Sequence, residues 1–88
     1  MQNIKKGLIV RSISGHDRSE QYIVINFDDK FAYLVNGKSR PISNPKKKSL
    51  KHIIKTGENE DILKLIETNK IENSVIIKVL KDFKQGGC

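Results

Sequence analysis

The sequence predicts a mainly β protein with α-helix at its C-terminal end, built as a small five-stranded barrel followed by a two-helix hairpin. Three observations predict this fold class. Short apolar and β-branched stretches alternate with turn residues as far as Gly57, the apolar residues then follow a helical period, and 88 residues leave room for a single domain. We therefore divide the chain into a barrel over 1–57, a helical hairpin packed on it over 58–85 and a flexible tail over 86–88.

Five stretches have the composition of short β-strands. The second is the expected central strand, with Ile23, Ile25 and Phe27 on one face and Tyr22 and Val24 on the other. Pro41 removes a backbone donor from the fourth, which suits an edge or a bulge. Five such strands with tight turns favour a strongly bent barrel. They are Leu8–Ile13, Gln21–Phe27, Phe31–Val35, Ser39–Ile42 and Ser49–Ile54.

Turn chemistry separates these strands. Asp28-Asp29 predicts a tight connection between the second and third strands. Asn36-Gly37 predicts a type I′ hairpin turn, because that turn needs positive φ at both central residues and Asn-Gly tolerates this best. Asn44-Pro45 begins another turn, so we expect the three lysines after it to lie outside regular strand.

Two amphipathic helices are predicted after Gly57. Asn59 can cap the first, with Glu60 and Asp61 in its first turn, and Asn69-Lys70 ends it. Asn73 or Ser74 can cap the second. Each helix has one apolar stripe, and we prefer burial of both stripes in the protein's own core to a partner-binding role. The stripes are Ile62, Leu63, Leu65 and Ile66, then Val75, Ile76, Val79, Leu80 and Phe83.

Positive charge is concentrated in the predicted barrel. The chain has a net charge of +7, but residues 1–57 hold 12 Lys and Arg against 4 Asp and Glu, whereas residues 58–88 hold 5 against 6. A basic module beside a nearly neutral one is typical of phosphate binding, although a solvated lysine surface has the same composition.

The segment 38–55 is the stronger of two candidate contact regions. It contains seven basic residues and no acid, so their mutual repulsion would be relieved by a phosphate backbone. Nuclear targeting is another standard use of such a run. The basic residues are Lys38, Arg40, Lys46, Lys47, Lys48, Lys51 and Lys55.

The loop 14–19 is the other candidate region. Gly15 can bring backbone N–H groups close to a phosphate, and Arg11, His16 and Arg18 can supply charge or hydrogen bonds around it. Taken in isolation, this loop is better explained as a polar hairpin connection in which Asp17 closes its own turn.

Catalysis and cofactor binding find little support in the sequence. His16 and His52 are the only histidines, Cys88 is the only cysteine, and no glycine-rich phosphate loop opens a helix, so we expect no enzyme, metal or cofactor. A lone terminal cysteine indicates a reducing compartment, and no stretch matches a signal peptide or a membrane span. We expect a cytoplasmic protein without a membrane partner or a small-molecule substrate.

Several of these stretches together resemble a known family. Residues 7–18 followed by Tyr22-Ile23-Val24 resemble the KOW motif, and residues 34–40 with 45–53 are similar to bacterial KOW-domain RNA-binding proteins, relatives of the large-subunit ribosomal protein fourteen of archaea and eukaryotes. The likeness covers about Lys6 to Thr56. It implies an SH3-like barrel that binds structured RNA.

The resemblance also assigns roles to particular residues. Gly15 matches the loop glycine of the motif, Arg18 its basic position, and Lys46 to Lys48 with Lys51 the family's basic stretch. His16 stands where Lys or Arg is common, which makes the loop charge pH-dependent. Ser19 stands where a second glycine is common.

The charge distribution predicts binding to RNA phosphates, and the resemblance implies an RNA-binding protein of the ribosome. Its expected partners are ribosomal RNA and the large ribosomal subunit, and we expect it to be monomeric off the ribosome. Contact would be to phosphates and folded shape rather than to base edges. The alternative is a KOW-type protein-interaction module, or a ribosome assembly factor or translation regulator.

Overall fold

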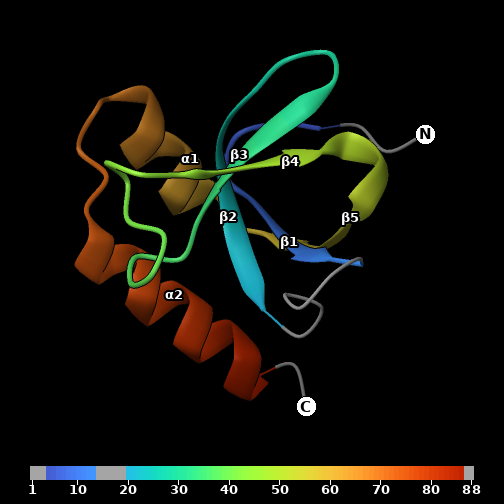
Figure 1. Cartoon of the computed structure of the whole chain (residues 1–88). Coiled ribbons are helices and arrows are strands. Elements are labelled where there is room, and N and C mark those ends of the chain that lie inside the picture. The colour runs from blue at the N-terminus through green and yellow to red at the C-terminus, as the bar shows by residue number, and fades with distance from the viewer. Residues whose placement is uncertain (1–3, 14–19, 87–88) are drawn as a thin grey trace.

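A computed structural model of the chain describes residues 4–13 and 20–86. One five-stranded antiparallel sheet is followed by two helices, and the strand order is β4-β3-β2-β1-β5 (Figure 1). The elements in chain order are β1 (Leu8–Ser12), β2 (Gln21–Phe27), β3 (Phe31–Val35), β4 (Lys46–Ser49), the 3₁₀ helix η2 (Leu50–His52), β5 (Ile53–Glu58), α1 (Glu60–Glu67) and α2 (Asn73–Gly86).

Three of the five predicted strands are confirmed. The second and third have the predicted bounds, and the first ends one residue early, at Ser12. The Asp28-Asp29 connection is also confirmed, because Asp28 N–H donates to the Phe31 carbonyl at 2.9 Å and the Asp28 carboxylate accepts from Lys30 N–H at 2.8 Å.

The two later strands lie elsewhere than predicted. The fourth was expected at Ser39–Ile42, but β4 is Lys46–Ser49, directly after the turn that was expected to keep the lysines out of a strand. The fifth was expected at Ser49–Ile54, but that stretch contains the η2 corner, and β5 runs on to Glu58. Pairing with β3, a tertiary contact, decides where β4 forms.

The Asn36-Gly37 turn is not of type I′. Only Gly37 has positive φ, at 82°, and Asn36 instead uses its side chain. Its Oδ1 accepts from the N–H groups of Lys38 at 2.9 Å and Arg40 at 3.0 Å, while its own N–H donates to the Arg40 carbonyl. An Asx-type turn of this kind consumes residues 36–40, which explains why no strand forms there.

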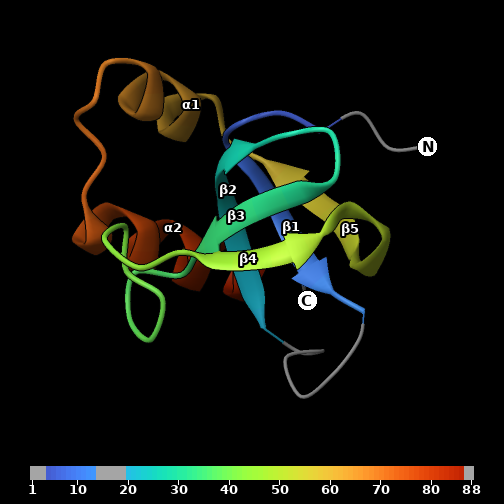
Figure 2. The same ribbon diagram turned by 45° about the horizontal axis from the view of Figure 1, so that its top comes forward.

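Both faces of the sheet are covered. The inner face of the curl is a core layer of Leu8, Val10, Tyr22, Val24, Ala32, Leu34 and Ile53. The opposite face packs Ile9, Ile23 and Val35 against Ile62 of α1 and Ile76 and Leu80 of α2. The predicted core role of the two helical stripes is thus confirmed except for Leu63 and Leu65, which are half-buried and do not belong to this layer. In Figures 1 and 2 the two helices lie over different parts of this face.

A register shift in β2 changes the face of one predicted core residue. Val24 pairs with Leu34 but Asn26 pairs with Tyr33, so Ile25 lies in a bulge. Ile25 therefore packs with the helix layer, while Phe27 packs against the inner core. The prediction that Ile23, Ile25 and Phe27 share one face is wrong for Phe27.

The sheet is open at its two edges. Among the described residues no pairing joins β4 to β5, and η2 connects them around a corner. Figure 2 shows the resulting curl, with β4 crossing in front of the other strands. No helix in residues 4–13 and 20–86 is long and apolar enough to cross a membrane.

The helix ends follow the predicted capping for α1 only. Asn59 caps α1, accepting from Ile62 N–H at 3.0 Å, and Thr68 is its C-cap. Asn73 begins α2, but its side-chain oxygen accepts from Ile42 N–H at 2.9 Å, so it holds the loop before β4 rather than its own helix. The backbone N–H groups of Val75 and Ile76 donate to the Glu72 carbonyl.

Candidate nucleic-acid interface

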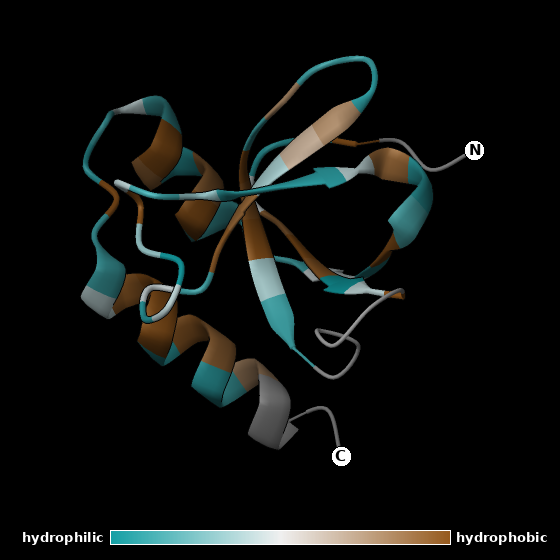
Figure 3. Cartoon of the chain, in the orientation of Figure 1, coloured by the Kyte–Doolittle hydropathy of each residue, from teal (hydrophilic) through white to brown (hydrophobic). Residues whose placement is uncertain are grey.

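The three consecutive lysines of β4 lie along one edge of the sheet. Among the described strands β4 pairs with β3 alone, with Lys46 opposite Leu34, Lys47 opposite Tyr33 and Lys48 opposite Ala32. Because side chains alternate along a strand, Lys46 and Lys48 lie on the face of the inner core and Lys47 on the other face. The hydrophilic colour of β4 against its apolar neighbours is plain in Figure 3.

Lys46 and Lys48 form a close pair of like charges. Both are half-buried at the rim of the inner core. Partial burial lowers the pKa of Lys46, and the neighbouring Lys48 ammonium lowers it further. An anion placed between these two ammonium groups would favour their charged forms.

Lys47 lies over an aromatic ring. Its Nζ is 4.3 Å from the centroid of the Phe31 ring, a cation–π contact of about 0.5–1 kcal/mol for an exposed lysine. Asp28 is nearby: backbone N–H groups of Lys30 and Phe31 lower the pKa of its carboxyl group, and the Tyr33 hydroxyl and the Lys47 ammonium add to this. The ammonium of Lys47 is therefore held at the surface beside an aromatic side chain.

Lys30 is a basic residue that the sequence did not single out. It lies in the connection between β2 and β3, and its carbonyl accepts from Leu50 N–H at 2.9 Å, which fixes this hairpin to η2. Lys51 in η2 is therefore close to it, and both side chains are exposed. We call Lys30, Lys47 and Lys51 the corner cluster. A lysine after two aspartates gave no sequence signal, because only the folded corner brings it to the other two.

An apolar hollow opens beside the corner cluster. Its volume is about 1160 Å³, and it lies between the β2–β3 hairpin and the β4–β5 corner. Its apolar lining comes from Ile4, Phe27, Phe31, Leu50 and Ile53, and its polar lining from Asp28, Asp29, Lys30, Ser49 and Lys51.

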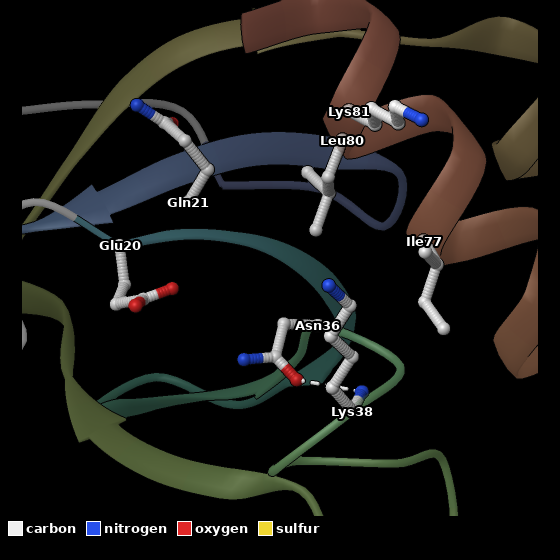
Figure 4. A pocket seen from close by; sticks show the side chains of 7 residues that line it. All are labelled: Glu20, Gln21, Asn36, Lys38, Ile77, Leu80 and Lys81. Atoms are coloured by element: carbon white, nitrogen blue, oxygen red, sulfur yellow. Dashed lines mark hydrogen bonds between the residues drawn. The ribbon is translucent and has the colours of Figure 1, made fainter.

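Lys38 and Arg40 lie in the loop before β4, away from the corner cluster. Burial raises the pKa of Tyr22, Glu20 adds to this rise and Arg40 opposes it, which places Arg40 near the Tyr22 end of the inner core. A smaller hollow of about 240 Å³ lies between this loop and α2. Figure 4 shows Lys38 and Glu20 among the side chains that line it. Charges of both signs line this hollow, so it is a poor phosphate site.

The remaining predicted contacts are not joined to the β4 lysines by the structure. Arg11 is half-buried in β1, paired with Gln21 and Ile54, and two strands separate β1 from β4. Gly15, His16 and Arg18 lie outside the described residues. Lys55, in the acid-free segment, has its Nζ 3.8 Å from a carboxylate oxygen of Glu58, which also pairs with Lys5.

Neither a metal site nor a match to a known family helps to define the function of this surface. Within the described ranges, no group of three potential ligands could hold a metal ion. The chain matches no protein-family profile, and no curated protein matches it. The physical case for a binding surface therefore rests on the residues themselves.

Proposed function

We propose that this protein binds structured RNA, ribosomal RNA first of all, through phosphate contacts made by the corner cluster and the β4 lysines. The observation that carries this proposal is that Lys30, in the β2–β3 connection, meets the continuous stretch that holds Lys47 and Lys51 at one exposed corner. Lys46 and Lys48 extend the positive charge along the adjoining edge. Exposed lysines brought together in this way supply the sequence-independent part of nucleic-acid affinity.

The topology supports the finer proposal of an SH3-like barrel of the KOW type. A curled sheet with the order β4-β3-β2-β1-β5, an inner core and a 3₁₀ corner before the last strand agrees with the resemblance of residues 6–56 to KOW-domain proteins. Ribosomal RNA as the ligand rests on that resemblance. Affinity for phosphates rests on the lysines.

A salt titration of RNA binding tests the phosphate contacts. We expect the protein to co-sediment with the large ribosomal subunit at low salt and to be released as salt rises. With roughly five phosphates neutralised, log K against log salt should have a slope of about −3.5 to −4.5. A binding constant that does not change with salt would refute phosphate contact.

A matched pair of triple variants separates a local site from overall charge. Lys30→Gln, Lys47→Gln and Lys51→Gln together remove three exposed lysines from the corner. Lys64→Gln, Lys70→Gln and Lys78→Gln together remove three exposed lysines from the helical part and change the net charge equally. We expect the first triple variant alone to lose most of its RNA affinity. Equal affinity of the two would rule out the corner as the site.

A second candidate function is protein interaction, favoured by two exposed apolar residues. Ile13 and Ile54 are 47% and 41% exposed, the largest such exposure in the described part of the chain, and both lie beside the β1–β5 pairing. The Ile13 N–H donates to the His52 carbonyl, which holds Ile13 next to the η2 corner. Association with the ribosome that survives nuclease treatment and is lost in Ile54→Ser would favour this candidate.

A further inference from the structure

The proposed phosphate contacts do not explain the apolar lining of the hollow beside the corner cluster. Its floor is formed by Ile4, Phe27 and Leu50, which are half-buried and pack against the inner core, and by the buried Ile53. A volume of about 1160 Å³ exceeds the range of roughly 300–1,000 Å³ typical of small-ligand sites. A planar group can therefore enter without displacing core side chains.

We propose that this hollow takes an unpaired nucleobase, extruded from the RNA whose flanking phosphates contact Lys30 and Lys51. The inference rests on the proposed RNA-binding function and deepens it: the preferred RNA has a bulged or looped nucleotide, not a continuous double helix. Specific recognition of RNA commonly uses such bases, splayed out of the stack and placed against aromatic side chains.

Phe31 provides the aromatic wall of the hollow. Phe31 lines the hollow together with Phe27, and the ammonium of Lys47 lies 4.3 Å from the centroid of the Phe31 ring. Base and phosphate are covalently joined, so a site for the base must lie within reach of cations for the phosphate. Phe31 and Lys47 meet this requirement through their direct contact.

The charges around the hollow fit a neutral base better than a phosphate within it. Asp28 and Asp29 contribute to the lining, and a carboxylate there would repel a phosphate. The Asp28 Oδ1 is engaged by the N–H groups of Lys30 and Phe31, both at 2.8 Å. A carboxylate accepts hydrogen bonds from the exocyclic amino group of a base, so adenine, cytosine or guanine suits this rim better than uracil. Lys30 and Lys51, both exposed, can then turn toward the phosphates outside.

The test compares three versions of one fluorescently labelled RNA hairpin. The first carries a single unpaired adenosine, the second has an abasic residue at that position, and the third is fully paired. We expect the first to bind about tenfold more tightly than the other two, because one base–aromatic stack contributes about that much. The salt dependence should be nearly the same for all three, since their phosphates are alike.

Two variants then test whether the preference for the unpaired adenosine arises in the hollow. Phe31→Leu keeps the site apolar but removes the ring that we expect to stack on the base, and Phe27→Leu combined with Phe31→Leu removes both aromatic side chains of the lining. Each variant should bind the three RNAs with equal affinity, and the salt dependence of binding should be unchanged. A cooperative thermal transition shows that the variant is folded. The comparison of the three RNAs with the wild-type protein remains a valid test even if one of the variants fails to fold.

The outcomes separate this inference from the proposed function. Salt-dependent binding with no preference for the unpaired adenosine would refute the inference and leave phosphate binding intact. A preference that persists in both folded variants would place the base elsewhere and also refute it. Absence of any salt-dependent RNA binding would refute both, and would favour a protein side chain as the group that occupies the hollow.

Discussion

The side-chain oxygen of Asn73, the first residue of α2, accepts a hydrogen bond from the backbone N–H of Ile42 at 2.9 Å. The two residues are far apart in the chain, and the bond fastens the loop before β4 to the second helix. Gly37 in the same loop packs closely against the start of α2. A Cβ at this position would lie 2.6 Å from the Asn73 carbonyl oxygen. The helical part therefore fixes the path by which the chain enters β4.

Asn73→Ala should destabilise the protein by about 1–2 kcal/mol, because the half-buried N–H of Ile42 would lose its partner. For a domain of this size the midpoint of thermal unfolding should fall by roughly 4–15 °C. Ser74→Ala is the control, since Ser74 is the next residue of the same helix and is exposed. A midpoint equal to that of the wild type in Asn73→Ala would show that the bond contributes nothing.

The strands that the sequence predicted correctly have local signals. β2 and β3 are apolar and β-branched, and Asp28 closes the turn between them with its own carboxylate, so a short stretch of chain determines this hairpin. The sequence of β4 has no such local signal. Three lysines and a serine have low strand propensity, and only the partner strand β3 makes them a strand.

Asp28→Asn should destabilise the protein at neutral pH, and this difference should disappear in acid. The pKa of Asp28 is lowered in the folded state, first by the N–H groups of Lys30 and Phe31. Its carboxylate therefore contributes stability above the pKa of the unfolded chain, about 3.9, and that contribution is lost as the pH falls through the lower, folded-state pKa. Urea denaturation of both proteins at pH 7 and at successively lower pH measures the difference.

Asp29→Asn is the matched control for this pH dependence. Asp29 is the adjacent, equally exposed carboxylate, but Asp28 is the one that accepts both N–H groups of the turn. We expect Asp29→Asn to have nearly wild-type stability at neutral pH, because the turn keeps both hydrogen bonds to the Asp28 carboxylate. Loss of stability at neutral pH in Asp29→Asn but not in Asp28→Asn would contradict the assignment.

Gly57→Ala should destabilise the packing of α2 on β5. A Cβ at Gly57 would lie 2.6 Å from Cε1 of Phe83, so the ring must move. Overpacking of this kind costs about 1–3 kcal/mol. Adding Phe83→Leu should relieve the clash, so the double variant should be more stable than the sum of the two single effects predicts. Strict additivity in urea denaturation would show that the two residues do not interact.

The candidate site was only partly predictable, because its members come together by folding. The acid-free run drew attention to Lys47 and Lys51, and their exposed positions support the proposed contact. It could not indicate Lys30, which joins them through the hydrogen bond from Leu50 to the Lys30 carbonyl. The acid-free run also could not show that Lys38 lies beside α2, because the Asx-type turn at Asn36 determines the path of the chain there.

Lys47→Gln should weaken RNA binding and reduce the steepness of its salt dependence by about 0.7–0.9, the contribution of one phosphate contact. Lys47→Arg keeps the charge and can still lie over the Phe31 ring, so its affinity should stay close to that of the wild type. Lys78→Gln, an exposed lysine of α2, is the charge-matched control and should leave the slope unchanged. If Lys47→Gln and Lys78→Gln change the slope equally, the RNA responds to the overall charge of the protein and not to this corner.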